Sequence, residues 1–236
     1  METDAWAELL VRYLHTDAEG VARFAYGDVA AEDRQALDAM LADWAAIPIK
    51  QYSRVEQLPY WINLYNALTV ALILEHYPVD SIQDISFGLF GGGPWDAERI
   101  TVEGRALTLN DIEHRILRPI WRDARLHYAL NCASVGCPNL RAAPWRSEDI
   151  EAALDEAARV YVNHPRGFHI AADGRAVVSK IYAWFIEDFG GDEAGVLAHL
   201  RAYAEGETAA RLETLDSLDE SVYSWALNAH PAPSEP

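Results

Sequence analysis

Hydrophobic residues recur at intervals of three and four along much of the chain, a spacing that predicts amphipathic helices. Residues 5–15 follow this pattern, and so do residues 31–46, after which Pro48 ends the second helix. Residues 55–76 are apolar nearly all round and stop before Pro78. Because a helix without a polar face must be covered by protein, we expect this third helix to be central and buried.

Short apolar stretches predict strands in the middle of the chain. Residues 100–107 are expected to form a β-hairpin around Glu103-Gly104, and residues 168–178 a second one around Asp173-Gly174. The segment His127–Asn131 is interpreted as a short buried strand. Together these segments predict a small, mainly antiparallel sheet.

Further helical patterns alternate with these strands. Asn110-Asp-Ile-Glu113 has the form of a capping box and predicts a helix that runs to about Arg118. Another helix is predicted over Ser147–Tyr161, with its first serine as the cap, and two more at about 179–187 and 193–204. Helices mixed with hairpins in this way indicate the α+β class.

We expect one helix-rich α+β domain with a small, mainly antiparallel sheet, because no repeat or linker divides the chain into two parts. Within it, residues 1–50 are expected to form an N-terminal helical segment packed on the core, and residues 51–230 to form the main domain. The Pro-rich residues 231–236 are expected to be a disordered tail.

Composition and charge narrow the range of functions. Hydrophobic residues make up 50% of the 236 positions, which is enough for a buried core without disulfide or metal staples. The formal net charge of -18 repels nucleic-acid backbones and anionic membranes, so neither is expected as a partner. The acidic N-terminus has no secretory signal pattern, and the two cysteines are too few for a disulfide scaffold. We therefore expect a cytoplasmic protein, unless an upstream segment has been removed.

Five motifs in order resemble those of the family catalogued as domain of unknown function 547. They cover much of residues 50–230 and are Tyr60–Leu68, Leu107–His114, His127–Pro138, Val178–Phe189 and Tyr223–Asn228. Ser224 departs from the acid that we expect before Trp225 in this family. The family name implies no established activity, and a cysteine-protease-like fold is a further hypothesis that the resemblance raises.

The segment from His127 to Pro138 carries the residues best suited to catalysis. A thiolate such as that of Cys132 is a nucleophile, an imidazole such as that of His127 can take its proton, and a third polar group usually orients the imidazole. Glu113 is the predicted orienting group, with Asn131 as the alternative. In an extended strand His127 and Cys132 would lie roughly 16 Å apart, so their contact requires the chain to bend after Asn131.

The same residue types permit other interpretations. Cys132 and His127 are equally typical of a buried core, where a cysteine behaves as a small hydrophobe. Cys137 is an alternative nucleophile and could also pair with Cys132 as a disulfide or a redox switch. A structural zinc site would need close pairs of ligands, which this segment lacks, so no metal or cofactor is expected.

Four further residues, together with Cys137, are candidates for binding. Asn63 and Asn66 share one face of the buried helix, where they either hold loop backbone or donate a hydrogen bond to an oxyanion. Asn131 directly precedes the first cysteine. Arg141 follows the second cysteine and could bind a substrate carboxylate or pair with an acid.

The leading hypothesis is a cysteine-dependent hydrolase or acyltransferase that acts on a peptide-like or amide bond of a small-molecule or peptide-like ligand. In this hypothesis Cys132 attacks a carbonyl, His127 carries the proton, and Glu113 orients the imidazole. One alternative is a thiol redox protein that uses Cys132 and Cys137. The other is a non-catalytic binding or scaffold module with the loop Gly88–Trp95 as its contact surface.

Overall fold

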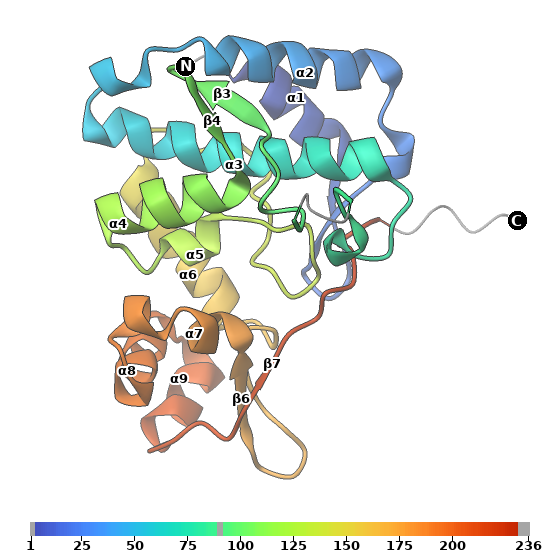
Figure 1. Ribbon diagram of the computed structural model, residues 1–236. Helices are drawn as coiled ribbons and strands as arrows, with labels where there is room; N and C mark the ends of the chain where they lie inside the picture. The colour runs from blue at the N-terminus through green and yellow to red at the C-terminus, as the bar shows by residue number, and fades with distance from the viewer. Residues whose placement is uncertain (1–2, 89–91, 231–236) are drawn as a thin grey trace, which may run out of the picture.

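The computed structural model of the protein describes residues 3–88 and 92–230. Three helices, α1 (Asp4–Tyr13), α2 (Ala31–Ala45) and α3 (Arg54–His76), lie together at one end of the molecule, as Figure 1 shows. All three were predicted from hydrophobic spacing, and their bounds agree with the prediction to within two residues. The tail predicted at 231–236 and part of the Gly88–Trp95 loop lie outside the described residues.

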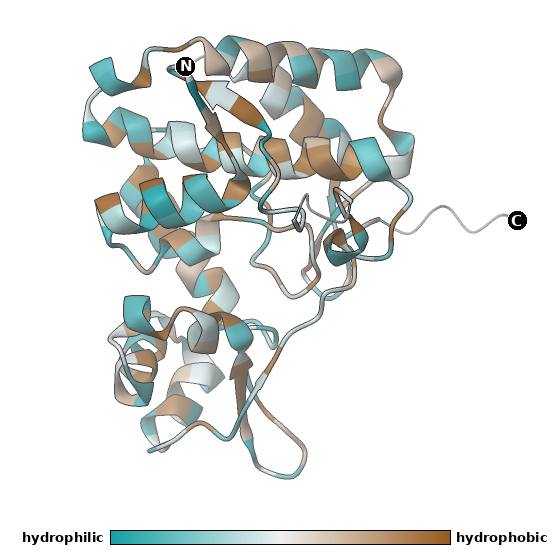
Figure 2. Cartoon of the chain, viewed as in Figure 1, coloured by the Kyte–Doolittle hydropathy of each residue, from teal (hydrophilic) through white to brown (hydrophobic). Residues whose placement is uncertain are grey.

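Helix α3 is the centre of this group, and its sequence explains both of its ends. Ser53 and Glu56 form a reciprocal capping box at the N-terminus. The helix ends before Tyr77, because Pro78 disfavours helical backbone at the residue that precedes it. Every residue from 58 to 74 is buried, as the lack of a polar face predicted, and hydrophobic colouring runs along much of α3 in Figure 2.

The strands form three small sheets. The elements β1 (Leu14–Thr16) and β2 (Ala22–Phe24) make an antiparallel pair. The hairpin of β3 (Ile100–Val102) and β4 (Arg105–Leu107) was predicted and is confirmed. The second predicted hairpin, β5 (Phe168–Ile170) with β6 (Ala176–Ser179), gains β7 (Glu220–Val222) in parallel alignment with β6. The hairpins therefore belong to separate sheets among the described residues, and not to one sheet as we expected.

The predicted strand over His127–Asn131 is wrong, because a short helix, α5 (Leu126–Ala129), occupies most of it. Asp123 starts this turn by accepting a hydrogen bond from the backbone N–H of Arg125 at 2.9 Å and one from that of Leu126 at 3.1 Å. A short apolar run fits a buried strand and a buried helical turn equally well, so periodicity alone misassigned it. The chain becomes extended only at Leu130.

The helix before α5 also begins differently from the prediction. It consists of a π-helical segment, η4 (Asp111–Leu117), continued by α4 (Arg118–Trp121). Thr108 and Asp111 form the reciprocal cap, with the Thr108 hydroxyl accepting from the Asp111 N–H at 2.9 Å. Asn110 makes no capping hydrogen bond with its side chain, so Glu113 is free of the capping role that the sequence suggested.

The remaining helices complete the second half of the molecule, below α3 in Figure 1. They are α6 (Ile150–Val162), α7 (Lys180–Trp184), α8 (Glu193–Tyr203) and α9 (Gly206–Glu213), with short 3-10 turns at Tyr26–Asp28, Ile49–Gln51, Ile82–Asp84 and Ile186–Phe189. Asp149 and not Ser147 precedes the first turn of α6. No helix among the described residues is both long enough and apolar enough to cross a lipid bilayer.

Two hydrophobic clusters make up the core of this α+β fold. The larger one surrounds α3, and the smaller one lies among α8, β5 and β6. Helix α6 belongs to both, because Leu154 packs in the larger cluster while Tyr161 and Val162 pack in the smaller one. This helix therefore fixes the two clusters relative to each other, and the segment that follows α5 runs along their junction.

Candidate functional site

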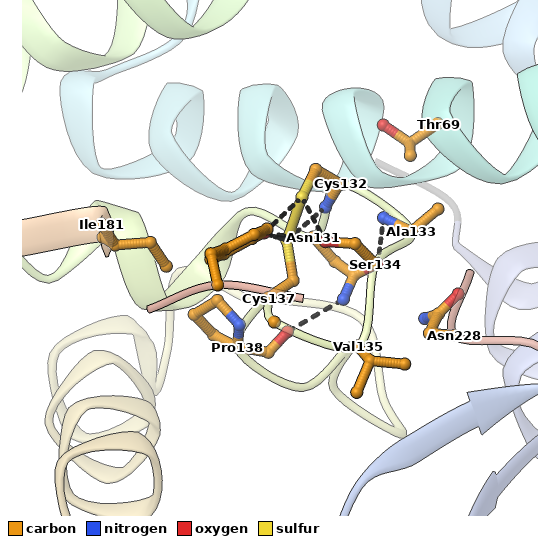
Figure 3. The surroundings of a disulfide bond; sticks show 12 residues. Thr69, Asn131, Cys132, Ala133, Ser134, Val135, Cys137, Pro138, Ile181 and Asn228 are labelled. Atoms are coloured by element: carbon orange, nitrogen blue, oxygen red, sulfur yellow. Dashed lines mark hydrogen bonds between the residues drawn. A yellow bond between two sulfur atoms is a disulfide. The ribbon is translucent and has the colours of Figure 1, made fainter. Parts of the chain in front are cut away.

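The segment after α5 is a tight loop closed by a disulfide between Cys132 and Cys137, whose Cα atoms are 6.2 Å apart (Figure 3). The Asn131 side chain braces the loop, because its amide donates to the carbonyl of Pro138 at 2.8 Å and its oxygen accepts from the N–H of Ala133 at 2.9 Å. The bend after Asn131, which a contact between Cys132 and His127 would require, is therefore present. In this state neither cysteine carries a free thiol.

The buried amides of α3 hold this loop and its neighbour. Asn66 donates to the carbonyl of Ala129 at 2.9 Å and accepts from the N–H of Asn131 at 2.8 Å. Asn63 makes the same pair of bonds with the backbone of Trp145, both at 2.9 Å. Both amides therefore hold loop backbone, the first of the two roles that we considered. Asn63 is fully buried and does not line the cavity beside the cysteines, so it is not placed to donate to an oxyanion there.

Backbone contacts from the C-terminal segment fix the other side of the loop. Gly136 donates to the carbonyl of Ser224 at 2.9 Å, and Val135 donates to that of Ala226 at 2.8 Å. From the smaller cluster, the Tyr161 hydroxyl donates to the carbonyl of Gly136 at 2.7 Å. Since buried backbone groups need partners, these bonds give the cysteine loop one well-defined shape.

A cavity of about 190 Å³ opens beside the disulfide, where the two hydrophobic clusters meet. Cys132 is half-buried and Cys137 is only 4% exposed, so Cys132 is the more exposed of the two cysteines. The polar and reactive side chains that line the cavity include Glu113, His114, His127, Cys132, Cys137 and Tyr223. The structure thus brings together the three residues predicted for catalysis.

His127 is held in one orientation by its neighbours. Its Nε2 atom lies 2.7 Å from Oδ2 of Asp188, and its ring stacks on Phe185 with the centroids 4.1 Å apart. The same Oδ2 accepts from Nε of Arg118 at 2.6 Å. The hydrogen bond from His127, aided by Arg118, holds the pKa of the Asp188 carboxyl well below its ordinary value. Asp188 is therefore ionised at neutral pH.

Glu113 faces the other imidazole nitrogen. Its Oε1 atom is 4.0 Å from Nδ1 of His127 and equally far from Nδ1 of His114. Glu113 is buried and hydrogen-bonded to Tyr65. Burial and the nearby Glu113 carboxylate raise the pKa of Tyr65 well above its ordinary value. The close carboxylate partner of His127 is thus Asp188, which the sequence reasoning missed. In the sequence this aspartate belongs to the motif Glu187-Asp188-Phe189, which contributes to the family resemblance but predicts no partner for His127.

Tyr223 is a second neighbour of the cysteines that the sequence did not single out for a role. Its hydroxyl oxygen lies 3.0 Å from the sulfur of Cys132, 3.2 Å from that of Cys137 and 2.7 Å from the hydroxyl of Ser134. Burial raises the pKa of Tyr223 far above neutrality, so the phenol keeps its proton and can donate it in a hydrogen bond.

The remaining predicted binding residue lies elsewhere. Arg141 donates to the carbonyl of Pro144 at 3.1 Å and to Asp149 at 3.0 Å, and it does not line the cavity. It pairs with an acid, one of the two roles that the sequence allowed. Within residues 3–88 and 92–230, no group of three or more His, Cys, Asp or Glu side chains is arranged to hold a metal ion.

Comparisons with known proteins agree with the motifs. Over 136 residues, 54% of this chain, the sequence is 32% identical to a protein of Anaeromyxobacter dehalogenans (strain 2CP-C) named glucose-6-phosphate isomerase. The chain spans only 22% of the length of that protein, and no solved structure gives a significant match. Residues 49–162, which include α3, Glu113 and the cysteine loop, match the family described as protein of unknown function, DUF547. The resemblance to the DUF547 family that the motifs predicted is confirmed over residues 49–162 of the chain.

Proposed function

We propose that the chain is a cysteine-dependent hydrolase or acyltransferase that acts on a peptide-like or amide bond, with Cys132 as its nucleophile. One observation carries the proposal: Cys132 and His127 line the same cavity, and Nε2 of the imidazole is occupied by the hydrogen bond that it donates to Asp188. That bond leaves Nδ1 as the atom that can exchange a proton with a thiol.

The residues of the cavity divide the reaction between them. His127 takes the proton of the Cys132 thiol, and the thiolate attacks the carbonyl carbon of the substrate. The protonated imidazole then gives that proton to the leaving amine as the carbon–nitrogen bond breaks, and a thioester remains on Cys132. Water, or another acyl acceptor, cleaves the thioester. Asp188 stabilises the protonated imidazole in both half-reactions, because its carboxylate is ionised and 2.7 Å away.

This chemistry requires the reduced protein. In the disulfide state the sulfur of Cys132 is bonded to that of Cys137, so it carries no thiol to deprotonate. A dithiol reductant converts the pair to two thiols and is itself oxidised to a disulfide. A reducing compartment such as the cytoplasm, where we expect the protein to act, supplies this condition.

The bonded pair itself favours a second candidate function, the thiol redox protein. In that reaction a substrate dithiolate attacks the accessible sulfur of Cys132 and displaces the Cys137 thiolate. The second substrate thiol then attacks the mixed disulfide, so the substrate leaves oxidised and both cysteines remain reduced. This reaction needs both cysteines, whereas acyl transfer needs only Cys132.

The two candidates separate in an assay with p-nitrophenyl acetate on protein treated with dithiothreitol. If Cys132 is the nucleophile, mass spectrometry finds an acetyl group on Cys132 that then disappears by hydrolysis. The variant Cys137→Ser should react without reductant, because it cannot form the disulfide. His127→Ala should slow acetylation by about 100-fold or more, whereas His169→Ala, a histidine outside the cavity, should behave as the wild type.

Two results would overturn acyl transfer. One is acetylation that spreads equally over other residues or is insensitive to His127→Ala. The other is a Cys137→Ser protein that folds, as judged by circular dichroism, but forms no acyl-enzyme. If the wild type then oxidises a test dithiol and Cys137→Ser does not, the redox candidate replaces the hydrolase.

A further inference from the structure

The walls of the cavity beside the disulfide are unusually rich in aromatic rings. Those that line it are Tyr65, Trp95, Trp184, Phe185, Tyr223 and Trp225. Trp225 is central, with ring centroids 4.7 Å from Tyr223, 5.5 Å from Trp184 and 5.6 Å from Trp95. Trp184 remains 45% exposed at the outer edge, which is uncommon for so large an apolar side chain. Aromatic rings carry electron-rich faces, so this lining is suited to a ligand that such faces attract.

Apart from its histidines, the described lining of the cavity carries negative charge and no positive charge. Glu113 is the acid among the described residues that line the cavity, and no lysine or arginine lies among them. The guanidinium of Arg118, which lies over the lining residue Phe185 at 4.8 Å, is paired with Asp188. Glu113 is only 8% exposed, and Tyr65 is its hydrogen-bond partner in the wall. The imidazole Nδ1 atoms of His127 and His114 also face this carboxylate, each 4.0 Å away. Since no lysine or arginine lies among the described lining residues, a cation from solution can stabilise the buried charge.

Aromatic faces combined with a carboxylate are the chemistry that recognises an organic cation. A cation over an aromatic ring is stabilised electrostatically, most strongly by tryptophan and most of all where water is excluded. The net charge of -18 also raises the local concentration of cations around the protein and disfavours anions. A neutral apolar group would use the rings but not Glu113, and an anion would be repelled by both.

We infer that this cavity binds an alkylammonium group, with Glu113 as counter-charge and the rings of Trp184 and Trp225 as its walls. The binding site does not depend on catalysis. Its identification as a substrate-recognition site does rest on the proposed function, in which case the substrate carries its cationic group close to the bond that Cys132 attacks.

Choline and its neutral carbon isostere 3,3-dimethylbutan-1-ol test the inference, because the two have the same shape and differ in charge. Binding is measured by titration calorimetry and by the change in tryptophan fluorescence, on the oxidised protein, which has no free thiol. We expect choline to bind at least tenfold more tightly than the isostere. Glu113→Gln and Trp184→Ala should each weaken choline binding severalfold or more.

The controls separate recognition from damage to the fold. Glu32→Gln removes the same charge from an exposed position on α2 and should leave choline binding unchanged. Trp184→Ala alters an exposed side chain, so it remains informative if Glu113→Gln unfolds. Equal affinity for choline and the isostere, or affinity for choline that neither cavity variant changes, would overturn the inference. If the protein binds choline but forms no acyl-enzyme, the proposed function alone is refuted. If it forms the acyl-enzyme but does not bind choline, the alkylammonium site alone is refuted.

Discussion

Nε2 of His127 and Oδ2 of Asp188 are joined by a hydrogen bond of 2.7 Å, although 61 positions separate the two residues in the chain. The histidine comes from α5 beside the larger hydrophobic cluster, and the aspartate from the turn that follows α7. The bond therefore joins the two halves of the molecule at the edge of the cavity. Because Nε2 is bonded to Asp188, Nδ1 is the imidazole nitrogen that faces away from it.

Asp188→Asn should slow acetylation of reduced Cys132 by about 100-fold or more, because an amide cannot stabilise the protonated imidazole and can select the wrong tautomer. The loss should appear in kcat and in kcat/KM alike, since the pair acts in the transition state. The neighbouring Glu187→Gln, which removes an exposed acid, serves as the control. Equal rates for the two variants would exclude Asp188 from the reaction.

The same pair should make the free energy of unfolding depend on pH. The pKa of Asp188 is lowered by its bonds to His127 and Arg118, so the folded state favours the ionised form. This stabilisation is complete above the pKa of an unfolded aspartate, about 4, and is lost as the pH falls toward the lower pKa of the folded protein. Urea unfolding of the wild type and Asp188→Asn from pH 7 to pH 3 measures it. The difference in unfolding free energy should shrink below about pH 4, whereas a constant difference would contradict the linkage.

Much of the helical framework could be predicted from the sequence, because α2 and α3 follow from hydrophobic spacing and from prolines that act within a few residues. The two hairpins could be predicted as well, but the grouping of strands into sheets could not, since the parallel pairing of Val177 with Glu220 depends on how two distant segments meet. The error at α5 has the same origin. The local pattern of Leu126–Ala129 fits two structures, and only the hydrogen bonds to Asp123 and the surrounding core decide between them.

The candidate site was predictable in composition but not in pairing. Cys132, His127 and Glu113 were chosen for their chemistry, and all three line the cavity. Asp188 lies 61 positions after His127 and Tyr223 lies 91 positions after Cys132, so no spacing rule connects them to these residues. Acids are also so common in this chain, 37 in all, that an aspartate in a motif does not stand out.

Asn66→Ala should destabilise the protein by about 3 kcal/mol, because it leaves the buried carbonyl of Ala129 and the buried N–H of Asn131 without partners. Urea denaturation measures the loss. Asn110→Ala is the matched control, since that amide donates to Asp96 at an exposed position, and it should cost about 0.5 kcal/mol or less. If the two substitutions cost the same, Asn66 does not hold the cysteine loop as we infer.

Gly136→Ala should destabilise the protein by about 2 kcal/mol or more and disturb the surroundings of the disulfide. A Cβ atom at this position would lie 2.8 Å from the nitrogen and 2.9 Å from the oxygen of Ser224, both of them backbone atoms that cannot rotate away. Relief of this clash must move the C-terminal segment outward, and Tyr223 would then withdraw from the two sulfurs.

Urea denaturation and the reactivity of the disulfide toward dithiothreitol report these two effects separately. Gly93→Ala is the control, because the atom that its Cβ would meet among the described residues is a side-chain oxygen of Asp96, at an ordinary contact distance of 3.9 Å. If Gly136→Ala matches this control in stability but reacts faster with dithiothreitol, the loop yields locally and Tyr223 shields the disulfide. If it matches the control in both measurements, the close contact between the cysteine loop and the C-terminal segment does not exist in solution.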